Sequence, residues 1–159
     1  KVPGVEVEHA PWHPGREVED FSRCDIGIYP LWDDAWAQGK CAFKAIQFMA
    51  CGVPVVAAAV GANQQVIQDG VNGFLASSPE AWVEKLLRLL SDPTLRAQVA
   101  DAGRRTIEER YSLSANAPLL ISTLQEAFHL PKGTGTLSAP SSVKEKSSSQ
   151  SLMYQEKVS

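Results

Sequence analysis

The sequence lacks long apolar runs, is poor in cysteine and has no excess of positive charge. No stretch of its 159 residues approaches the roughly 18 uninterrupted apolar residues that a membrane-spanning helix needs. Its first residues show no cationic segment followed by an apolar run, so no secretion signal can be read, and Lys1 in place of a methionine indicates an internal cut in a longer chain. The formal net charge of −3 leaves no basic surface for a nucleic-acid backbone, and we expect no nucleic-acid partner.

The cysteines Cys24, Cys41 and Cys51 are odd in number and lack the close paired spacing of zinc ligands. Nothing in the sequence argues for an oxidising compartment. We therefore interpret the three as small buried apolar residues and expect no metal site.

The rest of the chain alternates between strand and helix patterns. Short strands are predicted at residues 5–8, 25–31, 53–58 and 73–76, and the third is continuously apolar, as strands covered on both faces are. Helices are predicted at 16–24, 40–51, 61–68 and 115–128. A further helix is predicted to follow a capping box at 77–80, and another to run from Asp92 and Pro93 towards Tyr111. This order predicts an α/β fold with a doubly wound parallel sheet.

The end of the chain has a different composition. Beyond Pro131 it consists mainly of Gly, Ser, Thr, Pro and Lys, with few large apolar residues to offset the entropy of ordering. We predict a folded domain over residues 1–130 and a disordered low-complexity tail over 131–159.

The segment from residue 39 to residue 52 suits an anionic ligand. On a helix over 40–51, Lys40, Lys44 and Gln47 stand at i, i+4 and i+7 and form one stripe. The small and apolar residues that should face the sheet are Ala42, Ala45, Ile46 and Met49. Gly39 allows close backbone approach, and the free N–H groups of a first helical turn attract an anion such as a diphosphate. The alternative is a solvated helix face whose lysines only aid solubility.

Three sequence motifs together resemble a known enzyme family. They are MACGVPVVA at residues 49–57, VGAN at 60–63 and QDGVNGFL at 68–75, and they stand in family order and at family spacing. The likeness extends from about residue 5 to residue 128 and includes RRTIEERYS at 104–112. The chain resembles the C-terminal, donor-binding half of the family 4 (group 1) retaining glycosyltransferases of the GT-B fold.

The resemblance implies a Rossmann-like sheet and the transfer of a sugar from a nucleotide-diphosphate sugar to a carbohydrate or lipid-linked acceptor, without a further cofactor. An N-terminal GT-B domain missing from this chain would complete the crevice and supply the catalytic groups, so the chain alone should be inactive. The implied location is cytoplasmic, with a peripheral position at the inner membrane face as a variant. The donor-binding residues that the motifs and the helix start indicate are Gly39, Lys40, Cys41, Ala42, Lys44, Gln47, Gly61 and Asn63.

Two positions depart from the family pattern. The family commonly carries two glutamates where this chain has Gly39 and Gln47. Gln47 keeps an amide that can hydrogen-bond a ribose hydroxyl, without the strength that a charge adds. Two alternatives therefore stay open: a regulatory or scaffolding domain whose donor site has decayed, and a nucleotide-sugar epimerase.

Two flanking features add smaller expectations. The VGAN segment follows a strand and opens a helix, so its backbone either lines the nucleotide crevice at the carboxyl end of the sheet or forms a plain turn. Trp32 and Trp36 flank two aspartates upstream of the predicted helix. They form either a wall for a sugar ring or an acceptor, or simple loop packing.

Overall fold

The computed structural model describes residues 3–129 and has a parallel sheet at its centre. Its strands are β1 (Gly27–Tyr29), β2 (Val55–Ala58) and β3 (Phe74–Ala76), in the order β1-β2-β3. Ile28 pairs with Val56, and Ala57 pairs with Leu75. All residues of β2 are buried, because this central strand is covered on both faces. The strands predicted at 25–31, 53–58 and 73–76 are thus confirmed with narrower bounds.

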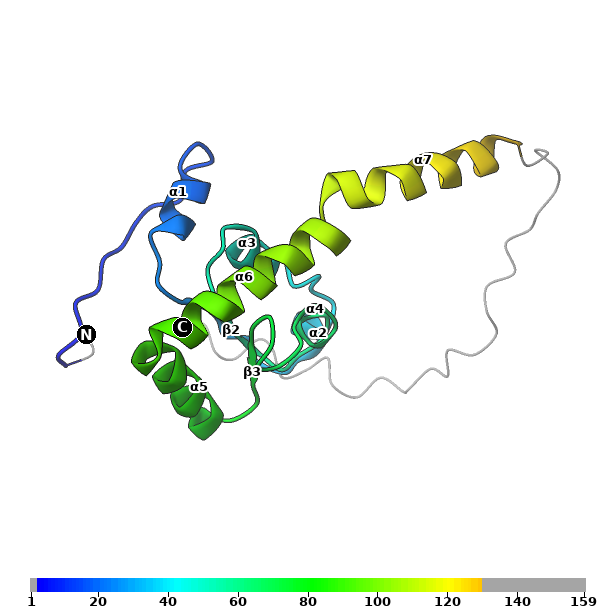
Figure 1. Cartoon of the computed structure of the whole chain (residues 1–159). Helices are drawn as coiled ribbons and strands as arrows, with labels where there is room; N and C mark the ends of the chain where they lie inside the picture. The colour runs from blue at the N-terminus through cyan, green and yellow to red at the C-terminus, as the bar shows by residue number, and fades with distance from the viewer. Residues whose placement is uncertain (1–2, 130–159) are drawn as a thin grey trace, which may run out of the picture. The chain divides into compact units, whose positions relative to one another are not determined.

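Helices follow the strands in alternation (Figure 1). They are α1 (Glu17–Ser22), α2 (Ala35–Gln38), α3 (Phe43–Ala50), α4 (Asn63–Val66), α5 (Pro79–Ser91), α6 (Pro93–Arg110) and α7 (Leu113–His129). The chain divides into the units Lys1–Leu124 and Gln125–Ser159. The tail and the domain boundary predicted after residue 130 lie outside the described residues.

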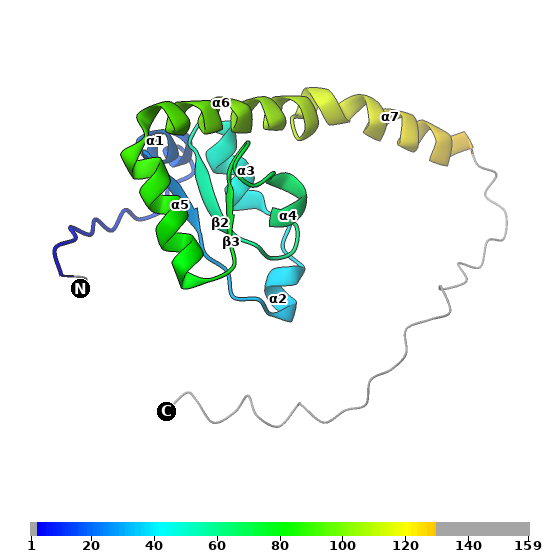
Figure 2. The same ribbon diagram turned by 60° about the horizontal axis from the view of Figure 1, so that its bottom comes forward.

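The two faces of β2 bury different helices. Val55 and Ala57 belong to a cluster with Ala45 and Met49 of α3 and Ile107 of α6. Val56 belongs to a second cluster with Phe74 and with Leu89 and Val99 of α5 and α6. Figure 2 shows α5 and α3 on opposite sides of β2 and β3. Because side chains alternate along a strand, one short strand anchors both layers, and the predicted doubly wound sheet is confirmed.

The side of α3 predicted to face the sheet does so. Ala42, Ala45 and Met49 are at most 1% exposed, and Ile46 packs against the same cluster.

Four of the described helices begin at a side chain that accepts a backbone N–H. Asp34 accepts from Ala37 at 2.7 Å, Ser78 accepts from Ala81 at 3.2 Å, Asp92 accepts from Leu95 at 2.9 Å, and Ser112 accepts from Ala115 at 3.1 Å. The capping box predicted at residues 77–80 is therefore displaced by one residue. The helix uses Ser78, because Pro79 then takes the first helical position, where its missing N–H costs nothing.

Two further predictions are wrong. Residues 5–8 form no strand, and Val5 and Val7 are more than half exposed. An extended segment needs a hydrogen-bonded neighbour, and the sheet of the described region holds only β1 to β3.

The cysteines are not buried apolar residues either: Cys24 and Cys41 are exposed and Cys51 is half-buried. Cys24 follows the end of α1, and Cys41 lies in a loop.

Candidate functional site

The turn before α3 differs from the prediction. The helix expected from Lys40 begins at Phe43, because Ala42 has φ 58° and ψ 21°, the left-handed conformation. Among the described residues it is the one non-glycine residue with positive φ, and such a conformation costs about 1 kcal/mol or more. The Lys40 N–H donates to Ala37 O at 3.1 Å and closes a turn after α2. Lys40 therefore does not share a helical stripe with Lys44 and Gln47.

This turn leaves the start of α3 open. Ala42 provides no side-chain cap, and the first bond of the helix runs from Ile46 N–H to Ala42 O at 3.0 Å. The N–H groups of residues 43–45 precede that bond and point out of the helix end. They form the positive end of the helix dipole, which attracts an anion.

The loop after β2 packs on the same region. Gly61 has φ +52°, and a Cβ added there would lie 3.0 Å from Gln38 O and 3.2 Å from Ala37 O. Only glycine permits this backbone-to-backbone contact. The contact brings Gly61 next to the end of α2, immediately before Gly39 and Lys40. The two sequence segments that carry the predicted donor-binding residues therefore meet in space.

The structure places Asn63 inside the loop after β2 and Gly39 at the end of α2. Asn63 is 1% exposed, and its Nδ2 donates to Ala58 O at 2.9 Å. This hydrogen bond stabilises the loop between β2 and α4. The Asn63 Oδ1 is buried without a partner among the described atoms. Gly39 ends α2 with φ −83°, which any residue adopts, and an added Cβ would make ordinary contacts there. Cys41 is exposed in the loop.

Lys44 and Gln47 meet a carboxylate from α1. The Lys44 Nζ lies 3.2 Å from Glu17 Oε1 and 5.0 Å from the centre of the Phe21 ring. Trp12 Nε1 donates to the same carboxylate oxygen at 3.2 Å. Gln47 reaches this carboxyl group too, while its own Oε1 is buried without a partner among the described atoms. Hydrogen bonds from Trp12 and Lys44 hold the pKa of Glu17 below its usual range.

Sequence reasoning missed Glu17 and Trp12 as members of this cluster. Glu17 stands 27 residues before Lys44. Its place in the first turn of a predicted helix was a visible signal for an anion-favouring position, but not for the helix that it would meet.

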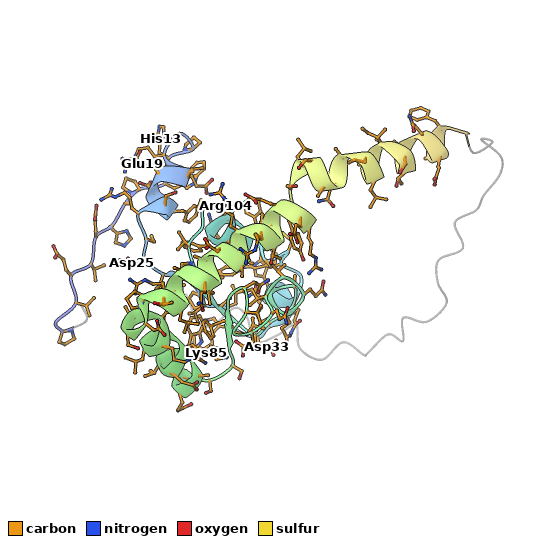
Figure 3. The ribbon with its side chains drawn as sticks, in the orientation of Figure 1. His13, Glu19, Asp25, Asp33, Lys85 and Arg104 are labelled. Atoms are coloured by element: carbon orange, nitrogen blue, oxygen red, sulfur yellow. The ribbon has the colours of Figure 1, made fainter. Side chains whose placement is uncertain are left out.

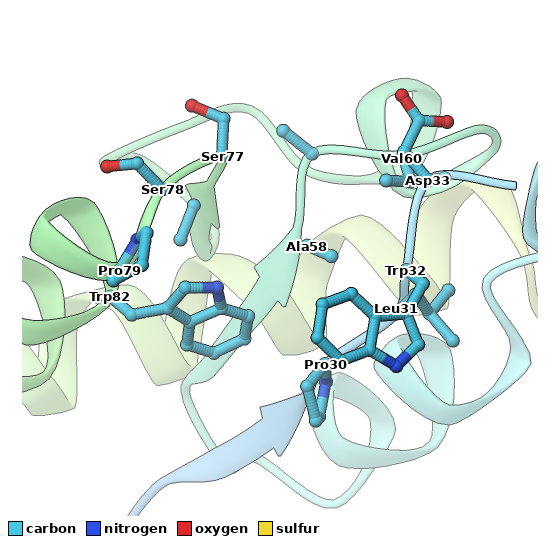
Figure 4. A pocket seen from close by; sticks show the side chains of 12 residues that line it. Pro30, Leu31, Trp32, Asp33, Ala58, Val60, Ser77, Ser78, Pro79 and Trp82 are labelled. Carbon is cyan, nitrogen blue, oxygen red and sulfur yellow. The ribbon is translucent and has the colours of Figure 1, made fainter.

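A pocket of about 740 Å³ opens at the carboxyl ends of all three strands (Figure 4). It is lined by Pro30, Leu31, Trp32, Asp33, Ala58, Ala59, Val60, Ala76, Ser77, Ser78, Pro79 and Trp82. The lining includes Trp32 and Trp82 but not Trp36, so Trp32 and Trp36 do not line this pocket together. Figure 3 shows Asp33 across the unit from Glu19 of α1, so the pocket is separate from the Glu17 cluster.

Residues 3–129 contain no candidate membrane span and no candidate metal site. None of the helices there is both long and apolar enough to cross a membrane. No group of three or more His, Cys, Asp or Glu side chains in that region could hold a metal ion.

The sheet order and its helices are those of the C-terminal domain of GT-B glycosyltransferases. The C-terminal domain of a glycosyl transferase group 1 family protein from Francisella tularensis superimposes with a TM-score of 0.55 at 26% identity, covering 66% of this chain and 53% of that one. The Anabaena protein HepE, solved in complex with UDP, has a TM-score of 0.55 at 21% identity over 68% of this chain and 29% of that one, which shows the fold alone.

The sequence comparisons name the family. Residues 12–92 match the family described as "Glycosyl transferases group 1". The D-inositol 3-phosphate glycosyltransferase of Xylanimonas cellulosilytica is 32% identical over 121 residues, which are 75% of this chain and 28% of that protein. The enzyme of the same name from Salinispora arenicola is 46% identical over 87 residues, 54% of this chain and 18% of that protein. The chain belongs to the group 1 glycosyltransferases, and it spans about a quarter of the length of such relatives.

Proposed function

We propose that this chain is the donor-binding half of an enzyme that transfers a sugar from a nucleotide-diphosphate sugar to a carbohydrate or lipid-linked acceptor. We infer retention at the anomeric carbon from the family resemblance alone. A second, N-terminal domain would form the other wall of the crevice and carry the acceptor and the catalytic groups, so the chain alone should not turn over. Its family membership supports the proposal, and so do the UDP and UDP-glucose bound to the Anabaena neighbour.

The observation that carries the proposal is the open start of α3. Three N–H groups of residues 43–45 lie behind a left-handed Ala42 that offers no cap. A diphosphate there would accept hydrogen bonds from these groups and gain from the helix dipole. Lys40 stands in the loop just before them and adds a full positive charge. Lys44 is already 3.2 Å from Glu17, so less of its charge is free for a ligand.

The ribose would lie near Gln47. The Oε1 of Gln47 is buried and has no hydrogen-bond partner within residues 3–129, so a ribose hydroxyl could satisfy it, and leaving it unsatisfied costs free energy. Glu17 beside it supplies the negative charge that the family usually places at residue 47. This arrangement favours a working donor site over a decayed one.

Titration calorimetry of the full-length protein with UDP tests the proposal. Lys40→Ala should remove a charge-assisted contact of about 1.5–3 kcal/mol and weaken binding roughly ten- to hundredfold. Arg104→Ala is the matched control, since Arg104 is an exposed residue of α6 that pairs with Glu108 of the same helix. Equal affinities for both variants would contradict the site. Absence of UDP, GDP and ADP binding would favour the scaffolding alternative, and product formation without an acceptor would favour the epimerase.

A further inference from the structure

Two indole rings stand on either side of the end of β2, at Ala58 (Figure 4). Trp82 is half-buried and packs against the cluster of Ala37, Ala58 and Val60, which fixes its position. Trp32 is 88% exposed, so nearly its whole surface is free to contact a ligand. A rigid indole on one side and an open one on the other form a platform for a flat apolar face.

Polar groups of the pocket lie at its rim. Asp33 Oδ1 accepts from Gln38 Nε2 at 2.6 Å, and a carboxylate retains further acceptor sites on its second oxygen. Ser78 Oγ accepts the Ala81 N–H and so caps α5 at the rim of the pocket. Ser77 adds an exposed hydroxyl. The rim can therefore both accept from and donate to hydroxyl groups of a ligand.

The charge of the lining selects the kind of ligand. The lining includes Asp33 but no lysine, arginine or histidine. A phosphate or a nucleotide would meet only negative charge here. A purely aliphatic ligand would displace water from the Asp33 carboxylate without replacing its hydrogen bonds, which is unfavourable. A neutral ring with one apolar face and a set of hydroxyls satisfies the indoles and the rim together.

The pocket also adjoins the proposed donor site. Val60 lines the pocket, and the next residue, Gly61, is packed against Gln38 at the end of α2. A ligand at Trp32 would thus lie close to the loop that precedes α3. We propose that the Trp32–Trp82 pocket is a subsite for one neutral sugar ring of the acceptor, in addition to the acceptor site that the N-terminal domain would supply. The acceptor role rests on the proposed transferase function.

Ligand-observed NMR on the full-length protein tests the subsite, with the methyl glycosides of glucose, galactose and mannose as probes. Trp32→Ala should weaken binding of the glycoside that binds by about tenfold, the loss typical of an aromatic anchor. Trp36→Ala is the matched control, because Trp36 is 78% exposed but does not line the pocket. Asp33→Asn should weaken binding less, since an amide keeps an acceptor but loses the charge. All three variants change exposed side chains, so the fold should persist.

Several outcomes overturn the proposal. These are equal glycoside affinities for Trp32→Ala and Trp36→Ala, competition by inorganic phosphate for the pocket, and binding of none of the three glycosides to the unaltered protein. UDP titration of the same variants separates this idea from the proposed function. Retained UDP binding with no glycoside binding rejects the subsite alone. If the unaltered protein binds no UDP but binds a glycoside in a way that depends on Trp32, the sugar subsite is supported and its acceptor role is rejected.

Discussion

Substitution of Gly61 tests how closely the loop after β2 packs against the end of α2. Its Cβ position lies 3.0 Å from Gln38 O, 3.2 Å from Ala37 O and 3.2 Å from Gln38 Cα. These are backbone atoms, so Gly61→Ala must push the loop after β2 away from the end of α2. Alanine at positive φ costs about 1–2 kcal/mol, and overpacking adds about 1–3 kcal/mol.

Gly52→Ala separates these two contributions. Gly52 has φ +70°, and nothing lies within 4 Å of an added Cβ. It therefore carries the conformational cost without the clash. Both variants also restrict the unfolded chain by a similar amount, which cancels in the comparison.

Differential scanning calorimetry measures the difference. Gly61→Ala should be less stable than Gly52→Ala by about 1–3 kcal/mol, or roughly 4–12 °C in Tm for a domain of this size. In the full-length protein it should also weaken UDP binding, because the displaced α2 end carries Lys40 with it. Equal Tm losses in the two variants would refute the reasoning, since the clash would then contribute nothing.

Two predictions concern charges. Glu17→Gln and Gln47→Glu should each weaken UDP binding by about fivefold, whereas the double variant should return close to the original affinity, because it only moves the carboxylate; additive losses by calorimetry would contradict this. Burial acts to raise the pKa of Asp69, but hydrogen bonds from Lys85 and the Leu75 N–H outweigh it and lower that pKa. The Tm advantage over Asp69→Asn should therefore hold above about pH 4, the pKa of an unfolded aspartate, and decline as the pH falls below it; an unchanged difference at pH 3 would count against the ion pair.

Local patterns in the sequence determined the order of the elements. The continuous apolar run at 53–58 predicts a strand buried on both faces, and β2 is one. Asp92 and Pro93 predict a helix start, and Asp92 caps α6. Such signals depend only on neighbouring residues, on the period of burial and on the free N–H groups of a helix end. The family motifs at 49–75 are local in the same sense.

Tertiary structure decided which side chains meet. No period in the sequence places Glu17 beside Lys44, because that contact depends on how α1 packs against α3. Trp32 and Trp36 are close in sequence, yet the pocket pairs Trp32 with Trp82, because strand ends from distant segments meet at one sheet edge. Ala42 breaks the helical pattern that Lys40 would otherwise begin. Packing of layers selects these contacts and overrides local propensity, so a single sequence does not reveal them.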